Sequence, residues 1–191
     1  VLLPDRANKN ELHVERIDLG AAASEATAIK FDTTIDGEKN KFYYLLDYNH
    51  KAGEKNTFEK YRTDGKLALV REGQNGKIQD IVLNEGQKIE TAEGELVLET
   101  KESLADLSLR QIGARVYFDT TAEVSALKGA KLKLDNAKTV YVNDQAVAFR
   151  SEADGTIVLS DSPEEVVPPR DPSSGHGGIG GGGGGGTGGG T

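Results

Sequence analysis

Short turns built on glycine divide most of this chain into segments of strand length. Such turns lie at Asp36-Gly37, Asp64-Gly65, Asn75-Gly76, Glu93-Gly94 and Asp154-Gly155. Asn-Gly and Asp-Gly are the dipeptides that best tolerate the positive φ angles of tight hairpin turns. The segments between the turns alternate apolar and polar residues or form short apolar runs, as strands do. The sequence therefore predicts a mostly β fold, either an antiparallel β-sandwich or small barrels.

Three segments carry more specific expectations. Residues 41–49 (KFYYLLDYN) form the most hydrophobic and aromatic run, which predicts a central strand buried on both faces. The turns at Asp64-Gly65 and Asn75-Gly76 are each expected to join two paired strands in a hairpin. Residues 103–112 differ from the rest. Leu104, Leu107 and Ile112 are spaced nearly as on one face of a helix, and Ser103, which precedes them, is a suitable N-cap. One short helix, or a connector, is therefore expected near 103–112.

The end of the chain differs in composition from the rest. Thirteen of the 24 glycines lie in residues 175–191, and four of the five prolines lie between Pro163 and Pro172. Glycine has no side chain to bury and loses the most backbone entropy on ordering, so this tract cannot build a core. We therefore divide the chain into a β-rich domain (1–102), a second β-rich module or a continuation of the first (103–162), and a Pro/Gly-rich linker or tail (163–191). An engineered linker and a set of ordered, extended glycine chains remain alternatives for the tail.

Charge and composition exclude several classes of function. The formal net charge is −8 and the pI is about 5.0, whereas a nucleic-acid partner requires a basic face. No apolar run approaches the roughly 18 residues of a membrane span, so membrane insertion is not expected. The absence of Cys excludes disulfides, thiolate metal sites and cysteine nucleophiles.

Catalytic and metal-binding motifs are missing from the sequence. No nucleophile elbow, phosphate-binding loop or dinucleotide fingerprint occurs, and the three histidines have no metal-ligand spacing. We therefore expect a protein that is not an enzyme and has no cofactor. Ca²⁺ is the one cation for which loop carboxylates would be suitable ligands, although no EF-hand motif supports it and a solvated acidic surface is the preferred interpretation. The two loop clusters in question are Asp32/Asp36/Glu38 and Asp154/Asp161/Glu164.

Four tyrosines close together in sequence are the candidate ligand-binding residues: Tyr43, Tyr44, Tyr48 and Tyr61. Exposed aromatic rings on a sheet can stack on sugar rings. The competing interpretation, which we prefer, is that alternate members of the cluster face the core. The chain has no Trp, which weakens the case for sugar binding.

The last β segments, residues 139–149 (TVYVNDQAVAF) and 152–159 (EADGTIVL), are followed at once by the Pro/Gly tract. This order resembles the last β-module of Gram-positive bacterial cell-surface proteins of the surface-layer type, in which a Gly-rich linker precedes wall-anchoring repeats. The resemblance covers about 50 residues and includes no anchoring repeat. It implies an exported, modular protein with a structural, adhesive or assembly role.

The leading hypothesis is an extracellular structural protein of the bacterial cell envelope: a surface-layer, fibre or adhesin subunit. It would self-associate or bind other envelope proteins. The strand-edge residues Val1, Leu2 and Leu3 would pair with a neighbouring chain. The glycine tract, represented by Gly180, Gly183 and Gly186, would be the tether. The alternative is a carbohydrate-binding accessory module of an extracellular enzyme, with glycans as its partners.

Overall fold

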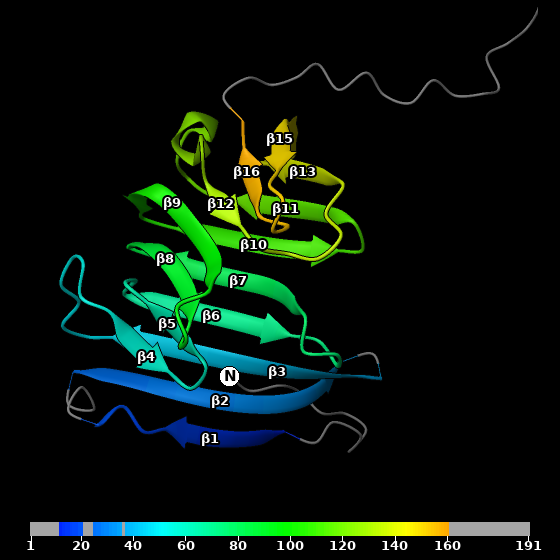
Figure 1. Cartoon of the computed structure of the whole chain (residues 1–191). Coiled ribbons are helices and arrows are strands. Elements are labelled where there is room, and N and C mark those ends of the chain that lie inside the picture. The colour runs from blue at the N-terminus through cyan, green and yellow to red at the C-terminus, as the bar shows by residue number, and fades with distance from the viewer. Residues whose placement is uncertain (1–11, 21–24, 36, 161–191) are drawn as a thin grey trace, which may run out of the picture.

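The structure is a computed structural model that describes residues 12–20, 25–35 and 37–160. Strands make up most of this part, and they form two sheets that lie face to face (Figure 1). The expectation of a mostly β, sandwich-like fold is therefore confirmed. The described residues form no α-helix, and a 3-10 turn, η2, spans Val124–Leu127.

The first sheet has nine strands. In spatial order they are β1 (His13–Ile17), β2 (Ala26–Ile35), β3 (Glu38–Asp47), β6 (Leu67–Glu72), β7 (Ile78–Asn84), β10 (Leu107–Ile112), β11 (Arg115–Asp119), β13 (Thr139–Val142) and β14 (Gln145–Val147). Neighbouring strands are antiparallel except β11 and β13, which run parallel. β1 and β14 are therefore the two edges of this sheet.

The second sheet has seven strands, all paired antiparallel. In spatial order they are β15 (Phe149–Ser151), β16 (Ile157–Leu159), β12 (Lys131–Leu132), β9 (Leu96–Leu104), β8 (Gly86–Thr91), β5 (Tyr61–Thr63) and β4 (Asn56–Phe58).

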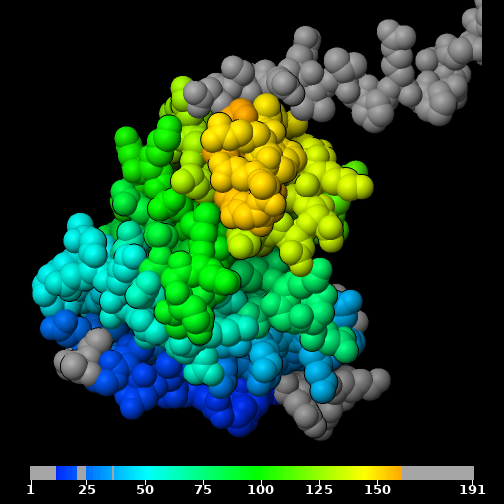
Figure 2. Space-filling model, in the orientation of Figure 1, coloured from blue at the N-terminus to red at the C-terminus, as the bar shows by residue number. Residues whose placement is uncertain are grey.

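The chain builds both sheets together, one hairpin at a time. Hairpins β2–β3, β6–β7 and β10–β11 lie in the nine-stranded sheet, and hairpins β4–β5 and β8–β9 lie in the seven-stranded sheet between them in sequence. Figure 2 shows the result, since the colours follow one another along the molecule from blue to yellow. Residues near in sequence therefore stay near in space, although the chain changes sheet repeatedly.

The sheets contain strands from both sides of residue 102. β9 runs through this position, β10 pairs with β7, and β12 pairs with β9. Directly paired core residues form one row across the nine-stranded sheet: Tyr43, Val70, Ile81, Leu109, Phe118 and Val142. Residues 103–160 and the preceding part of the chain thus share one hydrophobic core.

Several predicted turns are present where the dipeptides place them. Asn75-Gly76 joins β6 to β7 and Glu93-Gly94 joins β8 to β9, with positive φ angles of 74° and 93° at the two glycines. These two turns form as predicted because their conformation depends on local backbone preference. A further turn without glycine, at Asn143 and Asp144 with φ of 47° and 65°, joins β13 to β14.

The turn at Asp64-Gly65 is different, and the prediction of a hairpin there is wrong. β5 belongs to the seven-stranded sheet and β6 to the nine-stranded sheet, so this dipeptide lies where the chain crosses between layers. The Asp64 carboxylate accepts hydrogen bonds from the backbone N–H groups of Gln87 and Lys88, at 2.9 and 2.8 Å. Asp64 therefore satisfies backbone donors of a neighbouring strand, and β6 pairs with β3 and β7 instead of β5.

Two other expectations are met only in part. Residues 103–112 form no helix but contain a connector, the other alternative, because Leu104 ends β9 in one sheet and Leu107 begins β10 in the other. Their near-helical spacing arises from two strands separated by a two-residue crossing.

The strand expected at 41–49 is present as β3, but its burial alternates: Tyr43 and Leu45 are buried, whereas Tyr44 is only partly so. One face of β3 faces the core and the other faces outward.

Candidate functional site

The four tyrosines predicted to bind ligand lie in three different places. Tyr43 and Tyr61 are buried between the sheets, with ring centroids 5.3 Å apart in an edge-on arrangement. Tyr44 is half-buried on the outer face of the nine-stranded sheet. Tyr48 follows β3, is 63% exposed, and donates a hydrogen bond to Thr27 Oγ1 at 2.9 Å. The structure therefore does not bring these rings onto one exposed surface.

The two buried tyrosines belong to a polar group at the edge of the core. The Tyr61 hydroxyl donates to the buried Glu72 carboxylate, which also contacts Lys60 Nζ. The Lys60 ammonium lies 5.4 Å from the Tyr43 ring centroid and 5.6 Å from that of Tyr61. Burial raises the pKa of Tyr43 to about 12, and burial together with the Glu72 carboxylate also raises the pKa of Tyr61. Both phenols thus stay neutral, and the Tyr61 hydroxyl together with Lys60 satisfies a carboxylate that would be costly to bury alone.

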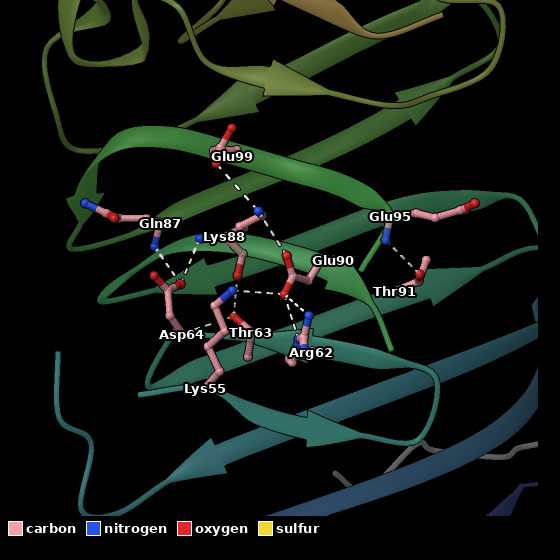
Figure 3. Close-up of polar contacts among 11 residues, drawn as sticks. Lys55, Arg62, Thr63, Asp64, Gln87, Lys88, Glu90, Thr91, Glu95 and Glu99 are labelled. Carbon is pink, nitrogen blue, oxygen red and sulfur yellow. Dashed lines mark hydrogen bonds and ion pairs between the residues drawn. The ribbon is translucent and has the colours of Figure 1, made fainter. Parts of the chain in front are cut away.

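A second polar cluster lies on the seven-stranded sheet around Glu90 of β8 (Figure 3). The Glu90 side chain is only 4% exposed, yet three cations reach it. Lys55 Nζ lies at 2.9 Å, Arg62 Nε at 2.6 Å and Lys88 Nζ at 3.0 Å from its carboxylate oxygens. Since Arg62 belongs to β5 and Lys55 precedes β4, the carboxylate ties the β4–β5 hairpin to β8.

The cations determine the charge state of this carboxylate. Burial alone would raise the pKa of Glu90, but hydrogen bonds from Lys55, Lys88 and Arg62 outweigh it and lower the pKa to about 2. Glu90 is therefore ionised at any physiological pH. Each cation is between 29% and 40% exposed, so solvent moderates the energy of the cluster. The arrangement is that of a structural clamp between strands.

Glu90 predicts an acid-sensitive contribution to folding. Its pKa is about 2 in the folded protein, and an ordinary glutamate titrates near 4.5. The stabilisation is therefore fully present above about pH 4.5 and is lost as the pH falls toward 2. Between pH 6 and pH 2 the wild type should lose about 2 kcal/mol more unfolding free energy than Glu90→Gln, measured by urea denaturation.

The control for this prediction is Glu99→Gln. Glu99 lies 3.7 Å from Lys88 and from Lys131, at the border of the cluster, and is 38% exposed. This variant should keep the acid sensitivity of the wild type. If Glu90→Gln and the wild type lose the same free energy over this pH range, the assigned role of Glu90 is wrong.

The outer face of the nine-stranded sheet carries a continuous row of side chains that crosses all nine strands. By direct cross-strand pairing its members are Val14, Phe31, Phe42, Arg71, Asp80, Arg110, Tyr117, Tyr141 and Ala146. Two stacked aromatic pairs lie in the row. The Phe31 and Phe42 rings are 4.4 Å apart with an interplanar angle of 7°, and the Tyr117 and Tyr141 rings are 5.1 Å apart at 11°. This outer face is therefore more than a solvated polar surface.

Charged side chains separate the two aromatic pairs. Asp80 contacts both Arg71 and Arg110, and its distance to Arg110 Nε is 2.9 Å. The sequence could not reveal this row, because its members come from nine separate segments. The sequence shows only which residues of each strand share a face. It does not show the register between strands, which decides which of those residues lie side by side.

One of the two edges of the same sheet is β1. Within the described part of the chain, β1 pairs with β2 alone. Val14 is 53% exposed and Leu12, just before the strand, is 45% exposed. On the opposite face His13 lies 3.2 Å from Glu15, which in turn lies 3.0 Å from Lys30. An exposed edge strand with apolar side chains is a template for pairing with another chain.

The proposed assembly residues at the chain ends, Val1, Leu2, Leu3, Gly180, Gly183 and Gly186, lie outside the described residues. The same is true of Asp36, Asp161 and Glu164 of the two acidic loop clusters.

Asp154 caps its own turn and accepts hydrogen bonds from the Thr156 backbone and hydroxyl, both at 2.9 Å. Across residues 12–20, 25–35 and 37–160 no group of three or more His, Asp or Glu is placed to hold a metal ion.

The described part of the chain has no helix long and apolar enough to cross a membrane. No protein-family model matches the chain, and no curated protein matches it in sequence.

Proposed function

We propose that this chain is a non-enzymatic structural subunit of a bacterial cell surface that assembles with copies of itself or with other envelope proteins. The observation that carries the proposal is the free edge β1, with its exposed Leu12 and Val14. The cell-surface location rests on the order of the last β segments and the Pro/Gly tract, which resembles that of surface-layer-type proteins.

An exposed edge strand offers unpaired backbone N–H and C=O groups to a partner strand. Natural sheets block such edges with charges, above all Lys, with Pro or with bulges; β1 (HVERI) has no Lys, Pro or bulge, and its charged residues are Glu15 and Arg16. Leu12 and Val14 add apolar area next to the stacked Phe31 and Phe42 rings. The apolar outer side of β1 therefore favours addition of a strand.

The charges of β1 favour a register centred on Val14 over registers centred on Glu15 or Arg16 for pairing with a second copy. Consider two copies of β1 paired antiparallel, with the outer faces of both sheets on the same side. The two-fold axis then lies midway between one residue of β1 and the same residue of the second copy. An axis at Val14 places Val14 against Val14 of the second copy and His13 against Glu15 of the second copy. An axis at Glu15 or Arg16 would place like charges opposite each other, which is unfavourable. The register centred on Val14 is thus the one we propose.

The test is the substitution Val14→Lys. It replaces an apolar contact by two facing ammonium groups, and it should weaken self-association at least tenfold. Sedimentation velocity over a series of protein concentrations measures the effect, and circular dichroism checks that the fold is retained. Ile35→Lys makes the same chemical change at the far end of β2, where Ile35 is 40% exposed, and should leave association unchanged.

Two results would contradict the proposal. One is a wild-type protein that stays monomeric at every concentration and binds no envelope protein. The other is a Val14→Lys variant that associates as tightly as the wild type, which would place the interface elsewhere.

A further inference from the structure

The outer face of the nine-stranded sheet is hollowed over β7, β10 and β11. One hollow, about 450 Å³ in volume, is bounded by Asp80, Arg110, Tyr117 and Asp144. A second, about 470 Å³, is bounded by side chains that include Asp106 and Asn143. Val82, Ser108 and Asp119 line both hollows, so the two form one groove across the sheet. Each half has the size of a small-ligand site.

The groove follows from side-chain size along two neighbouring rows. Val82, Ser108 and Asp119 are cross-strand neighbours on β7, β10 and β11. The next row holds Asp80, Arg110 and Tyr117 in the same order, and Arg110 and Tyr117 are much larger than Ser108 and Asp119 beside them. Ser108 is therefore a small side chain at the centre of the floor, and the longer side chains of the next row form a wall.

That wall presents the face of an aromatic ring. Tyr141 stacks on one face of the Tyr117 ring, at 5.1 Å between centroids. Tyr117 lines the groove whereas Tyr141 does not, so the other face of the Tyr117 ring is turned toward the groove. The stacking also fixes the orientation of the ring before any ligand arrives. A preorganised ring face is suited to the flat, weakly polar C–H face of a sugar.

Polar groups around the ring remain available for a ligand. The Asp119 and Asp144 side chains are exposed and make no hydrogen bond or ion pair with another described residue. Arg110 is 65% exposed and uses its Nε to bond Asp80, which leaves its terminal N–H groups free to donate. The two carboxylates can accept hydrogen bonds from hydroxyl groups of a ligand, and the guanidinium can donate hydrogen bonds to them. These three side chains therefore match a ligand rich in hydroxyl groups.

Charge narrows the class of ligand further. Asp80 is compensated by Arg71 and Arg110, and Asp119 and Asp144 leave the groove with an excess of negative charge. An anionic glycan or a nucleic acid would be repelled. The groove also lacks a deep apolar pocket for the aromatic anchors typical of protein interfaces. We propose that this groove binds a chain of uncharged sugars, with one ring stacked on Tyr117.

This site is separate from the β1 edge, so it goes beyond the proposed assembly function and can fail independently of it. The probes are neutral hexasaccharides (cellohexaose, maltohexaose, xylohexaose, mannohexaose and chitohexaose), with titration calorimetry as the readout. At least one should bind the wild type, and an oligogalacturonate of the same length should bind at least tenfold more weakly.

The variants locate the site. Tyr117→Ala should weaken hexasaccharide binding at least tenfold, and Tyr117→Phe, which keeps the ring, should retain most of it. Asp119→Asn tests the polar contacts between the groove and the sugar. Because Asp119 is exposed, this variant should keep its fold. Tyr48→Ala removes an exposed tyrosine outside the groove and should leave binding unchanged.

The proposal is overturned if no neutral hexasaccharide binds, or if Tyr117→Ala and Asp119→Asn both bind like the wild type. A loss confined to Tyr48→Ala would move the sugar site to the tyrosine predicted from the sequence. Binding of a hexalysine peptide without binding of any sugar would assign the groove to a basic protein segment instead.

Discussion

Gly86→Ala is expected to lower the free energy of unfolding by about 3 kcal/mol, one of the largest effects of a single methyl group in this fold. A Cβ at position 86 would lie 2.5 Å from the Cα of Gly65 and 2.9 Å from its nitrogen. Both glycines lie at points where the chain crosses between sheets, Gly65 between β5 and β6 and Gly86 just after β7. Because the added carbon meets backbone atoms, no side-chain rotation relieves the clash.

The surrounding hydrogen bonds keep the two crossings together. Asp64 accepts from the N–H groups of Gln87 and Lys88, and the Thr63 hydroxyl donates to the Lys88 carbonyl at 2.8 Å. Moving Gly86 away from Gly65 would break these bonds, which leaves buried polar groups unsatisfied. The effect is therefore steric and polar together.

The matched control is Gly73→Ala. A Cβ there would meet only the amide end of the Gln79 side chain, which can rotate away. Neither Gly73 nor Gly86 has a positive φ angle, so both substitutions test space alone. Urea denaturation should show less than about 1 kcal/mol of loss for Gly73→Ala. Equal losses for the two variants would show that the close approach of Gly86 to Gly65 is not a constraint.

Phe118→Ala is expected to destabilise the whole described chain by about 4 kcal/mol. Phe118 on β11 is 1% exposed, and it pairs directly with Leu109 on β10 and Val142 on β13. Truncating it removes buried apolar area and leaves a cavity. Because β10 is bonded to β7, the loss should be felt on both sides of residue 102.

Hydrogen exchange read by mass spectrometry checks how far the effect extends. In Phe118→Ala, exchange should accelerate in β3, β6 and β7 as well as in β10, β11 and β13, and unfolding should remain a single transition. Ile112→Ala is the control, because Ile112 on the neighbouring β10 is 59% exposed and should cost little. Acceleration confined to residues 103–160 would mean that this segment unfolds as a separate module.

The turns predicted from the sequence are confirmed where the structure depends on a few adjacent residues. Asn75-Gly76 and Glu93-Gly94 form hairpin turns because their glycines adopt positive φ angles at little cost. Asp64-Gly65 has an equally good turn sequence, yet it carries the chain from one sheet to the other. Its neighbours decide the outcome, since Asp64 bonds to β8 and Gly65 packs against Gly86.

The same distinction explains the candidate sites. The alternation in β3 is the preferred interpretation of the tyrosine cluster from sequence, and Tyr43 faces the core whereas Tyr44 faces outward. The cluster around Glu90 could not be read from the sequence, because Lys55, Arg62 and Lys88 are brought to it by three separate segments. The helix expected near residues 103–112 failed because Leu104 and Leu107 belong to different sheets, a fact that spacing alone does not contain.

The amino-acid sequence by itself determined that this chain would be a β protein with short strands, since alternation and turn residues act locally. It also determined the absence of cysteine chemistry and the acidic net charge. Only the tertiary structure decided which sheet each hairpin enters and which residues lie side by side on the outer face. Register is the physical reason: a shift of one residue moves every side chain of a strand to the other face, and register is set by contacts between distant strands.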